Sequence, residues 1–85
     1  MNSHQKKLID KLVNNIDAVD LSDCQIILEM FGWIWKPGPG SHRLFRKRGE
    51  MPFCLPTLSG RGIKKVYKIK LRDFLEERYP QELEL

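Results

Sequence analysis

The tetrapeptide Pro-Gly-Pro-Gly at residues 37–40 constrains the fold more than any other feature of the sequence. Each proline fixes its own φ and lacks an N–H donor, so no helix or central strand can run through this segment. The residues before it, 33–36, are aromatic and β-branched, and those after it, 41–47, mix apolar and basic side chains in alternation. The pattern therefore predicts two strands separated by a rigid turn.

A third strand is expected at residues 51–56, after a hairpin turn at residues 48–50. This strand contains Pro52 and Pro56, which cannot donate to a sheet ladder. Its position is therefore predicted to be at an edge of the sheet.

Apolar residues at helical spacing predict three helices, over residues 3–16, 23–31 and 67–79. Ser22 is a suitable N-cap for the second helix, and Gly32 stands where a helix commonly ends in a left-handed residue.

The predicted order is α-α-β-β-β-α, which indicates a small α+β fold in one domain over residues 1–85. A three-stranded antiparallel sheet needs a covered face to be stable in water. We therefore expect the helices to pack on one face and to leave the other face open to a partner.

Positive charge is concentrated in residues 36–72, which hold eleven Lys or Arg residues and one acid, Glu50. This segment carries a net charge of +10, whereas the rest of the chain carries −6. Clustered cations are typical of proteins that bind nucleic acid or phosphate. The alternative is a solvated face with no ligand.

Cys24 and Cys54 lie in apolar runs without metal-ligand spacing, so the sequence predicts neither a disulfide framework nor a metal site, and no cofactor. Buried small hydrophobic residues are the better interpretation. No apolar run approaches the roughly 20 residues that span a bilayer, so no membrane contact and a cytoplasmic location are expected.

His42 is the candidate catalytic residue, because histidine both accepts and donates a proton near neutral pH. RNA carries its own nucleophile, the 2′-hydroxyl, so a base and nearby cations suffice for metal-independent cleavage. The alternative is a histidine that only hydrogen-bonds a carbonyl or a phosphate. Ser41 is not expected to act as a nucleophile with His42, because adjacent residues on a strand face opposite ways.

The residues expected to contact RNA phosphates are basic, or small enough to present the backbone: Lys36, Gly40, Ser41, Arg43, Arg46, Lys47, Arg61 and Lys64. Trp35 is expected to stack on a base. For at least one of Trp33 and Trp35 a place in the core is the better interpretation, because so small a domain needs large aromatics inside.

Several short motifs occur in a characteristic order: Gly32-Trp33, Gly40-Ser41-His42 with Phe45 three residues on, a strand ending in Pro56, Ser59-Gly60, and a closing helix around residues 71–75. In this order and spacing the chain resembles the HicA toxin family over about residues 22–78. Residues 1–20 form an N-terminal extension that is expected to add a helix. Thr57 stands where the family often has a histidine, and Ile69-Lys70 replaces a Gly-Thr pair.

The resemblance implies a fold like that of the double-stranded-RNA-binding domain and the activity of an mRNA interferase. Such proteins are toxins of type II toxin–antitoxin systems that cleave RNA and inhibit translation. The resemblance makes His42 the catalytic residue and a HicB-like antitoxin the protein partner, with DNA contacted only through the antitoxin. Two alternatives remain: a non-catalytic RNA-binding module that uses the same basic face, and an interaction protein that meets an acidic partner.

Overall fold

The computed structural model describes residues 1–36, 42–58 and 62–84. The elements in chain order are α1 (Ser3–Asn14), a short 3-10 helix (Ile16–Ala18), α2 (Leu21–Met30), β1 (Ile34–Lys36), β2 (His42–Arg46), β3 (Phe53–Pro56) and α3 (Lys65–Arg78). This confirms the predicted α+β fold and the order α-α-β-β-β-α.

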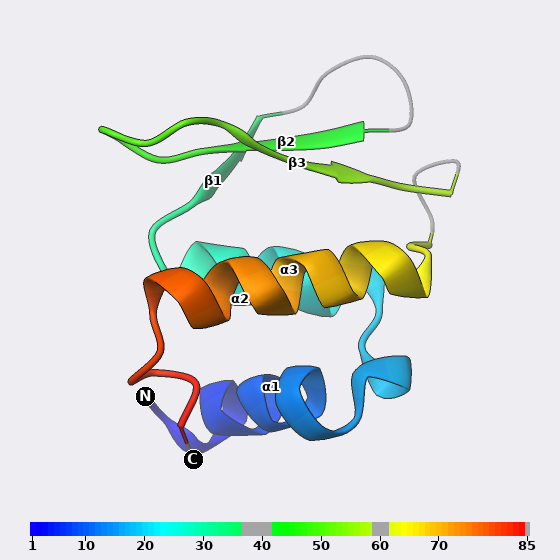
Figure 1. Cartoon of the computed structure of the whole chain (residues 1–85), viewed down its shortest axis with the longest axis vertical. Coiled ribbons are helices and arrows are strands. Elements are labelled where there is room, and N and C mark those ends of the chain that lie inside the picture. The colour runs from blue at the N-terminus through cyan, green and yellow to red at the C-terminus, as the bar shows by residue number, and fades with distance from the viewer. Residues whose placement is uncertain (37–41, 59–61, 85) are drawn as a thin grey trace.

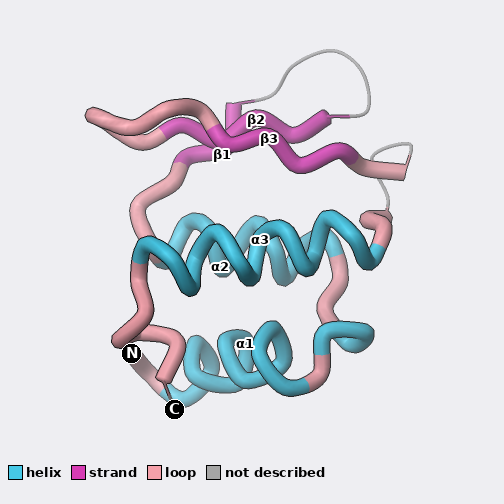
Figure 2. The backbone as a smooth tube through the Cα atoms, viewed as in Figure 1, coloured by secondary structure: helices cyan, strands magenta, loops and turns pink. Residues whose placement is uncertain are grey.

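The elements form three layers, with the sheet on one side, α2 and α3 in the middle and α1 on the far side (Figure 1). Helix α2 contacts β1, α3 contacts β3, and α1 packs on both of these helices. Among the described residues no element covers the other face of the sheet (Figure 2). We call this uncovered surface the open face.

The sheet is antiparallel throughout, with the order β1-β2-β3. Strand β3 is at an edge, as its prolines predicted. Phe45 of β2 pairs with Phe53 of β3 on one side and with Trp35 of β1 on the other. Residues paired across strands share a face, so the three aromatic side chains all point toward the helices. Phe45 is fully buried.

One hydrophobic core holds the three layers together. Helix α1 belongs to it, because its Ile9 and Leu12 are fully buried, and Lys11 forms an ion pair with Asp23 of α2 at 2.9 Å. The predicted N-terminal extension is therefore a structural layer of the domain. Other fully buried members are Trp33, Cys24, Ile27, Leu28, Leu55, Leu71 and Leu75.

The predicted N-cap at Ser22 is wrong, because α2 begins earlier and Asp20 caps it. The Asp20 carboxylate accepts hydrogen bonds from the Asp23 amide and from the Ser22 hydroxyl, both at 2.8 Å. The Asp23 carboxylate in turn accepts from the Asp20 amide at 3.2 Å, which completes a capping box. Ser22 therefore supports the cap from inside the helix.

The end of α2 is as predicted, since Gly32 follows the C-cap residue Phe31 with φ +89°. A Cβ at Gly32 would also lie 3.4 Å from Cε of Lys47. Both observations favour glycine here. Across the part of the chain that the structure describes, no helix has the length and apolar character needed to cross a membrane.

Candidate nucleic-acid interface

The pairing of the strands decides which side chains reach the open face. Residues paired across strands share a face, and neighbours along a strand alternate. Since Phe45 points to the helices, its neighbours in β2 and their partners point away from them. The described residues of the open face are Ile34 and Lys36 from β1, His42, Leu44 and Arg46 from β2, and Cys54 and Pro56 from β3.

His42 is exposed and is the first residue of β2, where it pairs with Pro56. Two other predicted RNA contacts, Lys36 and Arg46, are exposed on the same face. Lys36 pairs with Leu44, two residues along the strand from His42. The sheet therefore holds an imidazole and two cations on one rigid surface without an acidic residue among the described members of that face.

Arg43 lies on the opposite side of the sheet. Its guanidinium carbon is 4.5 Å from the ring centroid of Trp35, and its Nη1 donates a hydrogen bond to the side chain of Gln25 in α2. A flat guanidinium over an indole ring is a favourable cation–π arrangement. The contacts hold both predicted RNA-binding residues, Arg43 and Trp35, between the sheet and α2; their contact with RNA stays a prediction.

Lys47 follows the end of β2 and points inward. Its Nζ donates to the carbonyl oxygen of Phe31 at 2.7 Å and to the hydroxyl of Tyr79 at 2.9 Å. The carbonyl belongs to the C-cap of α2, where a cation is favoured by the helix dipole. Trp33 donates to the same hydroxyl from its indole nitrogen at 3.3 Å. Lys47 thus joins the ends of α2, β2 and α3, and its contact with a phosphate also stays a prediction.

Of the remaining predicted contacts, the structure describes only Lys64, which is not on the open face. Lys64 is the exposed N-cap residue of α3, in the helix layer. Gly40, Ser41 and Arg61 lie outside the described residues.

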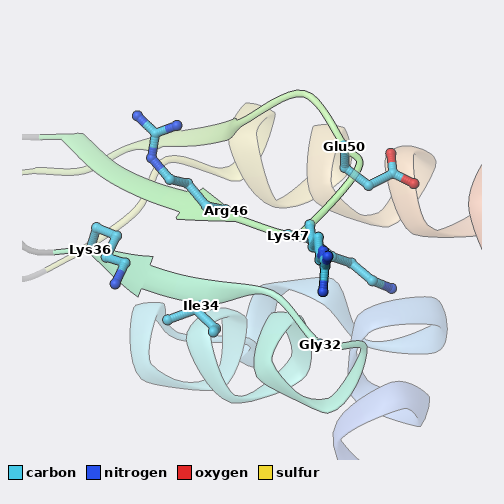
Figure 3. Close-up of a pocket in the computed structure, with 7 residues that line it drawn as sticks. Gly32, Ile34, Lys36, Arg46, Lys47 and Glu50 are labelled. Atoms are coloured by element: carbon cyan, nitrogen blue, oxygen red, sulfur yellow. The ribbon is translucent and has the colours of Figure 1, made fainter.

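A groove of about 550 Å³ lies at the end of β2 farthest from His42 (Figure 3). Ile34 and Lys36 line it from β1 and Arg46 from β2, while Gly32 and residues 47, 48 and 50 complete its wall. Sequence reasoning did not single out Ile34 or Arg48. The alternation of β1 could have indicated Ile34, whose side chain lies on the open face with 59% of its surface exposed.

Glu50 is the acid within the basic segment, and it also lines the groove. Its carboxylate forms an ion pair with Arg78 of α3, whose guanidinium also lies 4.8 Å from the ring centroid of Phe74. The pairing with Arg78 offsets the negative charge that Glu50 would otherwise bring to the groove.

Within residues 1–36, 42–58 and 62–84, no group of three or more His, Cys, Asp or Glu side chains is placed to hold a metal ion. Cys24 and Cys54 are both free thiols. Cys24 is buried, as predicted, whereas Cys54 is half-buried on the open face. Comparisons with family models, curated proteins and solved structures found no match to this chain.

Proposed function

We propose that this protein is a metal-independent endoribonuclease that acts as a toxin of the HicA type. The observation that supports the proposal best is the exposed His42 on the open face, which it shares with Lys36 and Arg46. A small domain with an open, cationic sheet suits a substrate that is long, anionic and bound along a surface.

In the proposed reaction the His42 imidazole accepts the proton of a ribose 2′-hydroxyl. The 2′-oxygen then attacks the adjacent phosphorus, and the bond to the 5′-oxygen of the next nucleotide breaks. That oxygen leaves with a proton from the solvent, which reaches this open surface freely. Lys36 is the nearest described cation on the face by strand register, and it stabilises the charge that develops on the phosphate.

The proposed setting is the cytoplasm, where the protein cleaves mRNA and inhibits translation. A HicB-like antitoxin neutralises it there, and any contact with DNA is made through that partner. The sequence motifs that resemble the HicA family, with His42 in the Gly-Ser-His element, support this part of the proposal.

The test compares the wild-type protein with His42→Ala and with His4→Ala, which removes the other histidine, exposed in α1. Each is expressed in cells from a repressible promoter, and growth and RNA integrity are followed. The wild type and His4→Ala should arrest growth and degrade RNA, whereas His42→Ala should do neither while keeping its circular dichroism spectrum. RNA cleavage that survives in His42→Ala, or a wild type that leaves RNA intact, contradicts the proposal.

A second candidate is an RNA-binding module without catalysis. It is favoured by the lack, among the described residues of the open face, of an acidic side chain or a second histidine to share proton transfer with His42. In this case purified wild type and His42→Ala bind RNA equally and neither cleaves it. Binding by phosphate contacts weakens steeply as salt is raised, because counterions are released.

A further inference from the structure

The groove at the end of β2 has the chemistry of a second binding site. Lys36, Arg46 and Arg48 are all exposed there. The ammonium of Lys47 is held by Phe31 and Tyr79 and so belongs to the wall. With Glu50 paired to Arg78, the groove presents more positive than negative charge to a ligand.

The groove is separated from His42 by the length of β2. Arg46 is four positions along the strand from His42, which corresponds to about 14 Å at the usual rise of a β-strand. A phosphate in contact with His42 therefore cannot also fill the groove. Lys36, paired with Leu44, lies between the two positions and makes the cationic path continuous.

The groove also offers an apolar surface next to its cations. Ile34 is 59% exposed and lies directly opposite Arg46 in the strand pairing. An inorganic anion would gain nothing from this side chain, whereas the sugar or base of a nucleotide would bury apolar area against it.

We propose that the groove binds single-stranded RNA a few nucleotides away from the phosphate at His42, with Arg46 and Arg48 on the backbone and Ile34 against a sugar or base. This assignment rests on the proposed function, because it takes RNA as the ligand of the open face. It adds that productive binding requires an RNA long enough to reach both ends of β2.

The experiment measures RNA binding in a His42→Ala background, so that cleavage does not interfere. A labelled single-stranded 12-nucleotide RNA is titrated at several salt concentrations with and without Arg46→Gln and Arg48→Gln together. We expect affinity to fall about ten-fold, and the slope of log affinity against log salt to become shallower by about 1.4, since each phosphate contact on a single strand contributes about 0.7. The matched control is Lys65→Gln with Lys70→Gln, which removes two exposed cations of α3 and should leave both quantities nearly unchanged.

Two further arms test the position and chemistry of the site. A dinucleotide, whose single phosphodiester can lie at His42 or in the groove but not at both, should lose less affinity in the groove variant than the 12-nucleotide RNA does. Ile34→Ser should weaken binding of the 12-nucleotide RNA but not of inorganic tripolyphosphate. An equal loss in the α3 control, an equal loss for the dinucleotide, or an equal loss for a duplex RNA of the same length overturns the assignment.

The two proposals fail in different ways. If the wild type leaves RNA intact but the groove variant loses affinity as described, the nuclease proposal is wrong and the groove assignment stands. If the wild type cleaves RNA and the groove variant binds as tightly as its parent, the groove assignment is wrong and the nuclease stands.

Discussion

The ammonium of Lys47 donates a hydrogen bond to the hydroxyl of Tyr79, with 2.9 Å between Nζ and the oxygen. The residues are 32 positions apart, at the ends of β2 and α3. The same ammonium donates to the Phe31 carbonyl at the end of α2. Lys47, a basic residue of the cationic segment, thus stabilises the fold by linking these three elements.

We expect Lys47→Met to lower the free energy of unfolding by about 1–3 kcal/mol, because the Phe31 carbonyl loses its charged donor in a part-buried site. For a domain of this size that corresponds to a fall in Tm of roughly 4–8 °C per kcal/mol. Thermal unfolding followed by circular dichroism measures it. Arg48→Met, at the exposed neighbouring position, is the control and should stay within about 0.5 kcal/mol of wild type.

A double-mutant cycle with Tyr79→Phe tests the contact itself. The coupling free energy between positions 47 and 79 should be about 0.5–3 kcal/mol, the range for residues in one hydrogen-bond network. Additive effects would mean that the two side chains do not stabilise each other.

Arg43 and Arg46 were both predicted from the sequence to contact phosphate, but we expect substitutions at the two positions to have different effects. Arg43→Ala should destabilise the fold by about 1–2 kcal/mol and change the tryptophan fluorescence, because the guanidinium leaves the Trp35 ring and Gln25. Arg46→Ala should leave stability and fluorescence unchanged but reduce the salt dependence of RNA binding, since Arg46 is exposed on the open face. Arg43→Lys should not restore stability, because an ammonium cannot stack as a flat group. A reduced salt slope in Arg43→Ala would support the sequence-based prediction that this residue contacts phosphate.

The strands could be predicted from the sequence because their signals are local: a Pro-Gly turn, a short hairpin and two prolines that exclude a central position. Which side chains lie on each face of the sheet was harder to predict. Leu44 and Phe45 are adjacent and both apolar, so the pattern of β2 does not say which one faces the core. Only the register with Trp35 and Phe53 decides it, and with it the open-face position of His42.

The functions of the individual basic residues could not be predicted, because the charge of a side chain does not indicate whether it points toward the helices or toward solvent. Arg43, Arg46 and Lys47 lie within five residues, yet Arg43 packs against Trp35, Arg46 is exposed and Lys47 caps α2. The predicted N-cap of α2 was wrong for a similar reason. Asp20 and Ser22 are both residue types that cap helices well, and only the observed start of α2 at Leu21 shows that Asp20 is the cap.

The Asp20 cap should make stability depend on pH. Its hydrogen bond from the Asp23 amide, with the bond from the Ser22 hydroxyl, lowers the pKa of the Asp20 carboxyl below its ordinary value of 3.8. The unfolded chain therefore binds this proton more readily, and the stabilisation is complete above pH 3.8 and is lost as the pH falls through the lower folded value.

Urea unfolding of wild type, Asp20→Asn and Asp20→Ala at several pH values tests this cap. At pH 7 Asp20→Ala should be less stable than wild type by about 1 kcal/mol. Asparagine also caps a helix but does not titrate, so the advantage of wild type over Asp20→Asn should shrink as the pH drops below 3.8. A difference between these two proteins that is constant with pH would contradict a charged cap.

The two thiols provide a direct probe of where RNA lies. Burial raises the pKa of the Cys24 thiol to about 12, so almost none of it is thiolate at pH 8. Because Cys24 is fully buried, a reagent in solution cannot reach it in the folded protein. Cys54 is half-buried on the open face, one strand away from Leu44. Iodoacetamide should therefore alkylate Cys54 in the native protein and reach Cys24 only on unfolding, as peptide mass spectrometry can show.

Single-stranded RNA bound to the open face should slow the alkylation of Cys54 several-fold at saturation, in a His42→Ala background that leaves the RNA intact. The reason is steric, because Cys54 shares that face with Lys36 and Arg46. A Cys54→Ser variant is the control, since its remaining thiol should stay unmodified with or without RNA. RNA that binds with full affinity yet leaves the Cys54 rate unchanged must lie on another surface, and that result would remove the open face from the proposed mechanism.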